Sequence, residues 1–394
     1  MFLSLCLYNA NFNLLKINLF NYKHNFSVDA LQLKKANAID EIIATTTTNN
    51  AKIINNTDSK DNEKKMISNP FKEEIGSEKK EVREEDDNNL NLNNKILKNI
   101  SSSTTIPTTK SSNSIERFNF AAAGDWACTS KTKDTVKNII DHDAELVLAL
   151  GDLSYDSGAK CWLKIIKPIA EKTKIVIGNH EVESSKKLKD YMKAFNLEKQ
   201  YYSFNYKNVH FLALSTETSY DKGSKQYKFA ENDLEQNKDN SSTDWIIVFY
   251  HRNAYSSGGG LPDETNFRKA YHPLFDKYNV DLALQGHHHA YERMYPITFN
   301  DDSKNKPILN AQVKGSNVFQ NPDGTIFLTV GTGGAESMPV AKSKSFSAAK
   351  EDGVFGIINI DIEKEDDDKN ILTGTFINNK KKHKILDEFK IIKG

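Results

Sequence analysis

The sequence predicts an α/β domain over residues 117–394, and two features of the chain carry this prediction. Short apolar runs recur along this segment, and each is followed by glycine or a polar residue. Stretches with a helical spacing of apolar residues separate several of these runs. Unbroken apolar runs suit strands that are buried on both faces, and their alternation with helices indicates a largely parallel sheet. About 280 residues can form one compact domain of this class.

The spacing of apolar residues defines the expected elements. Strands are predicted at 118–125, 146–152, 174–181, 209–215, 245–252, 280–289 and 325–334. Helices are predicted between some of these strands, at 132–143, 161–172, 184–195 and 266–278.

Residues 1–116 differ in composition from the rest of the chain. The segment 27–116 is rich in Asn, Lys, Glu, Ser and Thr, and Phe71 is its single aromatic residue. It cannot bury enough apolar surface to offset the entropy of ordering, so we predict a low-complexity, disordered tail. Residues 1–20 begin with an apolar run that no Lys or Arg precedes and no small-residue cleavage site follows. They therefore make a poor secretory signal.

Charge and cysteine content argue against several classes of protein. The chain has 53 Lys+Arg and 53 Asp+Glu, and this balance disfavours a nucleic-acid scaffold or a membrane-surface binder. No apolar run reaches about 18 residues, so no ordinary membrane-spanning helix is expected. The cysteines include no CxxC spacing, which argues against a zinc finger or a thioredoxin-like motif. Cys128 and Cys161 either pair with each other or remain buried free thiols.

Side chains that can bind metal ions stand at the ends of five predicted strands. Asp125, Asp152 and Asn179 end the first three strands, and each lies 27 positions after the one before it. This distance fits one βαβ unit, which brings the three side chains to the same edge of adjacent parallel strands. His251 and the segment His287–His289 end two later strands. All of these side chains are therefore predicted to converge at one edge.

The consecutive histidines at 287–289 are the strongest single indication of a metal site. In an extended chain, residues two apart project from the same side, so His287 and His289 are predicted to address one ion or two neighbouring ions. His288 would then point the other way. Carboxylate, amide and imidazole donors together suit Fe, Zn and Mn. The donors are too many for one ion, and they suit two ions that share a bridging carboxylate.

The motifs that contain these residues resemble those of a known superfamily. In chain order they are GDW, GDLSY, GNHE, YHR and GHHHAYER, at 124–126, 151–155, 178–181, 250–252 and 286–293. They resemble the calcineurin-like metallophosphoesterase superfamily and, more narrowly, its purple acid phosphatase branch. Most of the superfamily has Asp-x-His in the first loop. Here Ala127 replaces that histidine, and Tyr155 follows Asp152 by three residues, which is the pattern of the narrower branch.

The resemblance implies a fold and a cofactor. The implied fold is a four-layer α/β/β/α sandwich of two packed mixed sheets flanked by helices, in which the runs at 352–362 and 371–377 close the second sheet. The implied cofactor is a pair of metal ions bridged by Asp152, namely ferric iron and a divalent ion (Zn, Fe or Mn). The implied ligands are Asp125, Asp152, Tyr155 and His289 for the ferric ion, and Asp152, Asn179, His251 and His287 for the divalent ion.

The activity that the resemblance implies is hydrolysis of phosphate monoesters by attack of a metal-bound hydroxide. His180 matches the family's outer-sphere histidine, which binds a phosphoryl oxygen or protonates the leaving group. The rival interpretations are a phosphodiesterase or nucleotide hydrolase with the same metal ions, and a catalytically silent metal-binding protein. The family is often exported, so an extracytoplasmic location is slightly favoured and a cytoplasmic one stays open.

The sequence departs from plant members of the branch after the YHR motif. Those proteins have further histidines there, whereas 253–267 contains none, so protonation of the leaving group is expected to depend on His180 alone. Arg252 either assists the charge of the substrate or forms a surface salt bridge. Glu292 and Arg293 are expected to orient the histidine ligands that precede them.

Overall fold

The structure is a computed structural model, and it describes residues 116–258, 261–303, 305–366, 369–380 and 382–394. Apart from Glu116, the predicted tail lies outside these residues, and so does the signal considered for 1–20. Among the described residues, no helix has both the length and the apolar character that a membrane crossing requires.

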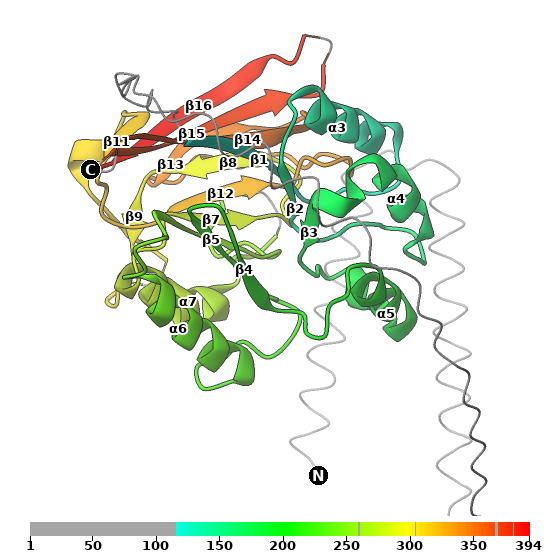
Figure 1. Ribbon diagram of the computed structural model, residues 1–394, viewed down its shortest axis with the longest axis horizontal. Coiled ribbons are helices and arrows are strands. Elements are labelled where there is room, and N and C mark those ends of the chain that lie inside the picture. Colours follow the sequence, from blue (N-terminus) through cyan, green and yellow to red (C-terminus); the bar gives the residue numbers. More distant parts are fainter. Residues whose placement is uncertain (1–115, 259–260, 304, 367–368, 381) are drawn as a thin grey trace, which may run out of the picture. The chain divides into compact units, whose positions relative to one another are not determined.

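Two mixed sheets form the centre of the described domain (Figure 1). The first sheet has the order β11-β16-β15-β14-β1-β2-β3, and the second has the order β13-β8-β12-β7-β6-β5-β4. The strands of the first sheet are β1 (Glu116–Ala123), β2 (Leu146–Ala149), β3 (Thr173–Ile175), β11 (Val318–Gln320), β14 (Gly356–Asp366), β15 (Lys369–Asn378) and β16 (Ile385–Lys393). The strands of the second sheet are β4 (Tyr202–Tyr206), β5 (Val209–Ala213), β6 (Trp245–Phe249), β7 (Leu282–Gln285), β8 (Tyr291–Met294), β12 (Ile326–Val330) and β13 (Ser347–Glu351). A small ribbon pairs β9 (Ile297–Thr298) with β10 (Ile308–Leu309).

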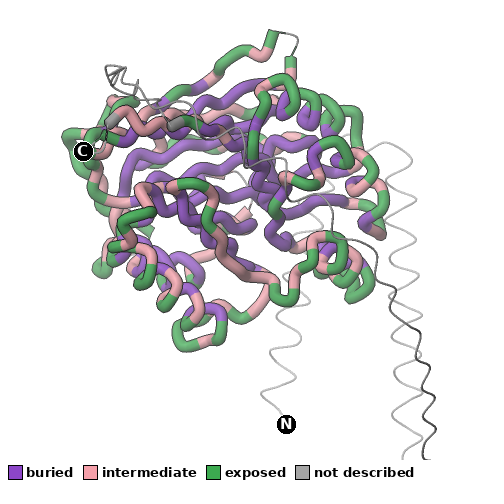
Figure 2. The backbone as a smooth tube through the Cα atoms, in the orientation of Figure 1, coloured by how far each residue is buried: buried purple, intermediate pink, exposed green. Residues whose placement is uncertain are grey.

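Helices cover the outer faces of both sheets, which confirms the predicted four-layer α/β/β/α sandwich (Figures 1 and 2). The first sheet is covered by α3 (Ser130–Asp141), α4 (Lys160–Ile165), α5 (Ser185–Ala194) and the 3₁₀ helix η1 (Lys167–Lys172). The second sheet is covered by α6 (Lys225–Asn237) and α7 (Thr265–Lys277). Two further 3₁₀ turns are η2 (Glu181–Glu183) and η3 (Ala311–Val313).

Strand β1 changes character along its length. Phe118, Phe120 and Ala122 enter the core between the two sheets, whereas Ala121 and Ala123 pack under the helices of the first sheet. From Phe120 to Ala123 both faces are therefore buried and the sequence is an unbroken apolar run, whereas at the start of the strand Arg117 and Asn119 alternate with the phenylalanines. The rings of Phe120 and Phe211 meet edge to face with centroids 5.4 Å apart across the sheets. Phe120→Ala is expected to cost about 3–5 kcal/mol of stability, because it leaves a cavity there.

The carboxyl ends of the parallel strands meet at one edge of the sandwich. In the first sheet β1, β2 and β3 run parallel, and in the second sheet β5, β6, β7 and β12 do the same. The amide of Gly124 donates to the carbonyl of Val330 (2.7 Å), which joins the end of β1 to the end of β12. The loops that follow all these strands are thus brought together.

One prediction about the sheets is wrong. The runs at 352–362 and 371–377 form β14 and β15, but these strands lie in the first sheet, where β14 pairs antiparallel with β1. Strands β2 and β3 extend the parallel part of the sheet on one side of β1, so the other side of β1 is available to pair with β14. The hydrophobic pattern of β14 suits either sheet, because the inner faces of both are apolar.

Cys128 and Cys161 form a disulfide, which settles the alternative that the sequence left open. Cys128 follows the loop after β1, and Cys161 lies in the first turn of α4. The bond therefore ties together two of the loops at the carboxyl edge.

Candidate metal centre

The first cluster of donor atoms contains a phenol, a carboxylate and an imidazole. The Tyr155 Oη lies 2.7 Å from His289 Nε2 and 3.3 Å from Asp125 Oδ1. His289 Nε2 is also 3.3 Å from Asp125 Oδ1. Three potential ligands thus converge from the loops after β1, β2 and β7, and a cation between them could contact all three.

The second cluster lies around His251. Its Nε2 is 3.2 Å from Asp152 Oδ2 and 3.2 Å from Asn179 Oδ1. Donor atoms of Asp152, His251 and His287 all lie within 4.8 Å of one another. The rings of His251 and His287 have centroids 5.1 Å apart. This cluster offers an amide, a carboxylate and two imidazoles.

The two clusters adjoin each other. The backbone amide of His287, from the second cluster, donates to Asp125 Oδ2 of the first (2.8 Å). Burial and the charges of Asp125 and Asp152 raise the pKa of Tyr155. Asp152 therefore acts electrostatically on the first cluster while it contacts the second.

Hydrogen bonds with main-chain groups orient Asp152, His251 and His289. In each side chain, one donor atom remains directed toward the other residues of its cluster. Asp152 Oδ1 accepts the backbone amide of His180 (2.9 Å), which leaves Oδ2 facing His251. His251 Nδ1 is bonded to the Leu150 carbonyl (2.8 Å), and His289 Nδ1 to the Glu336 carbonyl (2.6 Å). A carbonyl partner requires the proton on Nδ1, so Nε2 is free to bind a metal ion.

The backbone is strained where the strands end. Asp125, Asp152 and His287 have φ angles of 58°, 47° and 67°, in the left-handed region. Non-glycine residues held there cost on the order of 1 kcal/mol or more each, and such residues cluster at functional sites. Close approach also requires glycine, because a Cβ on Gly178 would overlap Asp152 Oδ1, and one on Gly286 would lie 2.9 Å from Asp125 Oδ2.

The three histidines are brought to the site differently from the prediction. The segment is not extended, because His287 has a positive φ and the amide of His288 donates to the Gly286 carbonyl (2.8 Å). His287 and His289 nevertheless reach the two clusters. His288 is buried against Gly258, where an added Cβ would lie 2.9 Å from its ring. It is therefore a packing neighbour of the two predicted ligands.

The electrostatics of the site favour cations. Burial lowers the pKa of His251, but Asp152 and Asp125 outweigh burial and raise it to about 10. Burial lowers the pKa of His287 to about 4, and the neighbouring His251 adds to this effect. The site thus stabilises positive charge beside its carboxylates and keeps a neutral imidazole nearby. These donors fit a pair of metal ions, and a bound ion would take the place of the proton on His251, since a metal ligand must be a deprotonated imidazole or carboxylate.

Glu181 is a residue of the site to which the sequence analysis gave no role. It is fully buried, and its two oxygens accept the amides of Leu153 and Gly178 (2.9 Å each). Burial and the charge of Asp152 raise the pKa of Glu181 to about 7. It ties the loop after β3 to the loop after β2, so it is a support and not a ligand. The sequence feature that could have identified Glu181 is its place as the last residue of the GNHE motif.

Arg252 forms a salt bridge, one of the two alternatives left open. Its Nε and Nη2 contact the two oxygens of Glu217 at 2.6 and 3.3 Å, and Nη1 lies 3.7 Å from Glu264. The guanidinium is therefore neutralised by the protein.

Glu292 and Arg293, which follow the three histidines, make contacts in different parts of the domain. Glu292 is buried and accepts the amide of Ser257 (2.7 Å), so it supports a neighbouring loop at this edge. Arg293 pairs with Asp387 of β16 (2.7 Å) and joins the two sheets. The expectation that both orient the histidine ligands is therefore wrong for Arg293.

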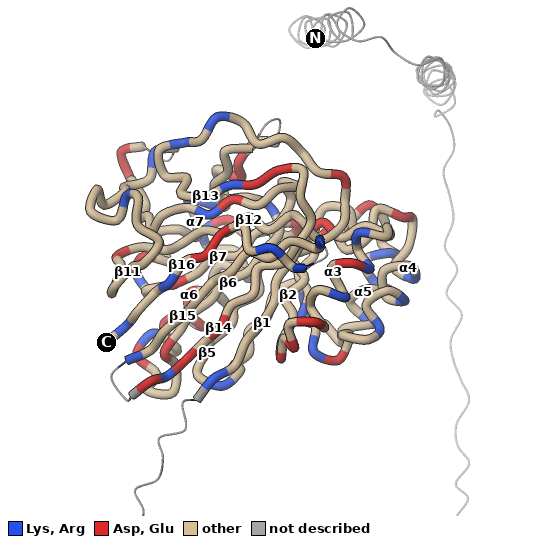
Figure 3. Tube along the Cα trace, turned by 90° about the horizontal axis from the view of Figure 1, so that it is seen from above, with Lys and Arg blue, Asp and Glu red and all other residues tan. Residues whose placement is uncertain are grey.

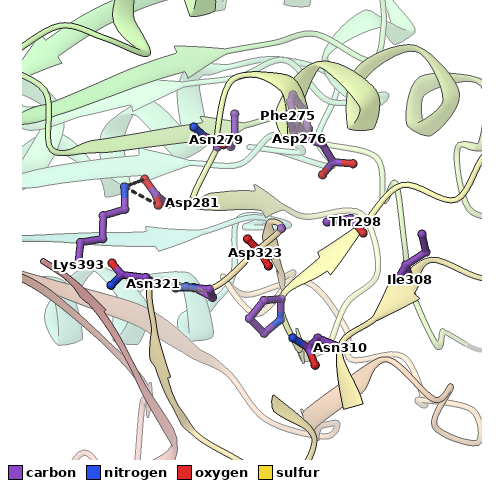
Figure 4. Close-up of a pocket in the computed structure, with 14 residues that line it drawn as sticks. Phe275, Asp276, Asn279, Asp281, Thr298, Ile308, Asn310, Asn321, Asp323 and Lys393 are labelled. Carbon is purple, nitrogen blue, oxygen red and sulfur yellow. Dashed lines mark hydrogen bonds and ion pairs between the residues drawn. The ribbon is translucent and has the colours of Figure 1, made fainter. Parts of the chain in front are cut away.

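A pocket of about 820 Å³ lies at the opposite edge of the sandwich, where β7 and β12 begin (Figure 4). Asp276, Asp281 and Asp323 line it, and Lys393 pairs with Asp281 at 2.7 Å. None of the predicted ligands contributes to this pocket.

The geometry defines a class of protein. Two packed mixed sheets, with two adjoining clusters of metal donors at the carboxyl edge, are the arrangement of a metallophosphoesterase. Residues 118–291 match the family model described as calcineurin-like phosphoesterase. Over this segment the chain is similar to calcineurin-like phosphoesterases, and the curated relatives and solved structures that it matches include purple acid phosphatases.

Individual relatives illustrate this similarity. Purple acid phosphatase 22 of Arabidopsis thaliana is 29% identical over 235 residues, which cover 55% of this chain and 50% of the relative. Acid phosphatase type 7 of Mus musculus is 30% identical over 251 residues, covering 55% and 54%. The chain thus spans about half the length of the curated relatives it matches.

Solved structures support the fold. The purple acid phosphatase PPD1 from yellow lupin seeds superposes with a TM-score of 0.59 at 25% identity, covering 70% of this chain and 54% of that chain. GAP50 of Plasmodium superposes with a TM-score of 0.53 at 15% identity, covering 71% and 89%, and this similarity concerns the fold alone.

Proposed function

We propose that this chain is a dinuclear-metal phosphoesterase that hydrolyses phosphate monoesters, of the acid phosphatase type. The observation that carries the proposal is the pair of adjoining donor clusters around Asp125 and Asp152 at the carboxyl edge of both sheets. Similarity to purple acid phosphatases supports the same activity. The substrate is then a phosphate ester.

The proposed ligands divide between two ions that share Asp152. Ferric iron would be held by Asp125, Asp152, Tyr155 and His289, and a divalent ion (Zn, Fe or Mn) by Asp152, Asn179, His251 and His287. When bound, such ions neutralise the charge of the ester phosphate and lower the pKa of water to near neutrality.

Tyr155 favours a strongly charged ion in the first position. Burial and two neighbouring carboxylates raise the pKa of its phenol, so the phenolate forms only beside a strong cation. A trivalent ion meets this requirement better than a divalent one. The second cluster offers neutral amide and imidazole donors, which suit a borderline divalent ion.

His180 is the proposed proton donor to the leaving group. Its Nε2 lies 3.8 Å from Asp152 Oδ2, so the ring faces the donor clusters while remaining partly exposed. Arg252 is held by Glu217 and Glu264, so it has less capacity to bind a phosphate. Among the described side chains near the clusters, His180 is therefore the best placed to give a proton.

The test compares two esters with the same leaving group. The full-length chain would be assayed with 4-nitrophenyl phosphate and bis(4-nitrophenyl) phosphate, at mildly acidic and at neutral pH. Faster monoester turnover that declines toward neutral pH is the expected result. A preference for the diester would keep the metal site but replace the proposed activity with that of a phosphodiesterase. No turnover of either ester by the metal-loaded protein would contradict the proposal.

A further inference from the structure

The second nitrogen of His180 has a partner that the proposed mechanism does not yet use. His180 Nδ1 lies 2.5 Å from Glu183 Oε1, three residues further along the chain. The 3₁₀ turn η2 places the two side chains side by side. A carboxylate accepts a hydrogen bond, so this contact fixes the proton on Nδ1 and leaves Nε2 directed toward Asp152.

The ring of His180 is held from a second direction. It packs on the ring of Tyr155, with centroids 4.1 Å apart and planes at 45°. The backbone amide of His180 also donates to Asp152 Oδ1 (2.9 Å). The imidazole is thus fixed by a stacking contact on its face and a hydrogen bond at one nitrogen. Its other nitrogen is the free one.

Glu183 is itself held by a buried lysine. Lys187 Nζ lies 3.4 Å from Glu183 Oε2 and donates to the Ser154 carbonyl (2.6 Å). The Lys187 side chain is only 1% exposed, whereas its neighbour Lys186 is 81% exposed. Figure 3 shows further Lys or Arg positions along α3, α4 and α5. Burying an ammonium group is costly unless it is paired, so this lysine marks a fixed network.

The network joins the two loops that carry His180 and Tyr155. Ser154 directly precedes Tyr155, and Lys187 lies in the first turn of α5. The chain of contacts runs from the Ser154 carbonyl through Lys187 and Glu183 to His180. A displacement of Glu183 would therefore reach the ring of His180 without touching a donor of either cluster.

We propose that Glu183 is the positioning residue of His180 and that Lys187 holds Glu183 in place, an inference that rests on the proposed function. As the P–O bond to the leaving group breaks, the leaving oxygen takes the proton from His180 Nε2. The imidazole is left neutral, with its remaining proton on Nδ1 and hydrogen-bonded to Glu183. Glu183 touches no substrate, and its effect is to keep Nε2 aimed at the departing oxygen.

The experiment measures turnover of two monoesters by the full-length protein loaded with iron and zinc. 4-Nitrophenyl phosphate needs little help from an acid because its leaving group is stable, whereas methyl phosphate needs a proton. Glu183→Ala is expected to lower kcat for methyl phosphate about 10-fold, the lower end of the range for lost supporting contacts. The kcat for 4-nitrophenyl phosphate and both KM values should change less than about 2-fold. Glu183→Gln, which can still accept one hydrogen bond, should fall between wild type and Glu183→Ala.

A matched control separates position from charge. Asp156→Asn removes the same charge from an exposed residue next to Tyr155, and its carboxylate makes no described contact with His180. Methyl phosphate turnover should be unchanged in this variant. An equal loss in Asp156→Asn and Glu183→Ala, or an equal loss for both esters, would overturn the positioning role.

A second measurement does not depend on activity. Long-range ¹H–¹⁵N spectra of the zinc-loaded protein, labelled at histidine, report which ring nitrogen of His180 is protonated. At a pH at which the imidazole is neutral, the wild type should have its single proton on Nδ1, and Glu183→Ala should have a mixture of both forms. An unchanged spectrum in Glu183→Ala would refute the inference. If the wild type hydrolyses neither ester, the proposed function fails, while this spectrum still tests the contact.

Discussion

The two edges of the sandwich differ in how the charges of their aspartates are balanced. At the edge where β7 begins, Asp281 is paired with Lys393 at 2.7 Å, so the chain supplies the cation itself (Figure 4). At the edge where the parallel strands end, Asp125 and Asp152 are buried, and their ion pairs among the described residues are with histidines. The comparison teaches that this second edge is built to receive positive charge from outside.

The strongest test of this comparison removes the carboxylate that is proposed to bridge the two metal ions. Asp152→Asn is expected to lower both bound metal and turnover of 4-nitrophenyl phosphate, by more than about 100-fold in turnover, above the cost of losing an outer contact. Metal content by mass spectrometry and steady-state assays would measure the two effects. Asp281→Asn at the opposite edge is the control and should retain its metal. Normal metal content in Asp152→Asn would rule out a bridging role.

The next test keeps the proposed metal ligands and removes the proposed acid. His180→Ala is expected to bind metal normally and to lose about 100-fold in turnover of methyl phosphate, because a general acid contributes at least this much. The loss with 4-nitrophenyl phosphate should be clearly smaller. Equal rates of wild type and variant on methyl phosphate would reject the acid role of His180.

Metal removal is expected to lower the thermal stability of the domain, and the donor clusters at the carboxyl edge are expected to account for this loss. A ligand present at about 100 times its dissociation constant stabilises the folded state by about 2.7 kcal/mol, which corresponds to about 5–10 °C in Tm for a domain of this size. Calorimetry before and after chelation would measure the shift. The Asp152→Asn variant should respond little to the chelator. A wild-type Tm that does not change on chelation would mean that the donor clusters bind no metal.

The smallest effect is expected at the opposite edge. Burial raises the pKa of Asp281, and Lys393 opposes this rise. Lys393→Met should therefore raise the pKa of Asp281 further and cost about 1 kcal/mol of stability at neutral pH. A carboxyl with a raised folded-state pKa loses stability as pH rises above its unfolded-state pKa. Denaturant unfolding should thus find a deficit that shrinks on acidification, with metal content unchanged. A deficit that grows on acidification would contradict this account.

Much of the fold and the converging residues could be predicted from the sequence because both follow from local pattern. Apolar runs ending in Asp125, Asp152 and Asn179 specify buried parallel strands whose carboxyl ends meet at one edge. The position of β14 could not be predicted, since its pattern suits either sheet. The path of His287–His289 was predicted as extended, but a positive φ at His287 makes it a tight turn.

The supporting contacts of the site were beyond sequence reasoning for another reason. Glu183 and Lys187 are four residues apart, a spacing that is common for charged residues on the surface of a helix. Only the fold brings the Ser154 carbonyl to Lys187 and buries the lysine. Arg252 likewise finds Glu217 in a loop that follows a different strand. Pairings of this kind depend on loop conformation, which charge pattern does not determine.

The disulfide between Cys128 and Cys161 has a practical consequence for any laboratory that prepares this protein. Closing a loop with a sequence separation of 33 removes freedom from the unfolded chain worth about 4 kcal/mol. The bond persists in oxidising compartments and is rare in reducing cytosol. Batches from a reducing and an oxidising expression host are therefore expected to differ in heat resistance although their sequences are identical. Variants are comparable only when they come from the same host.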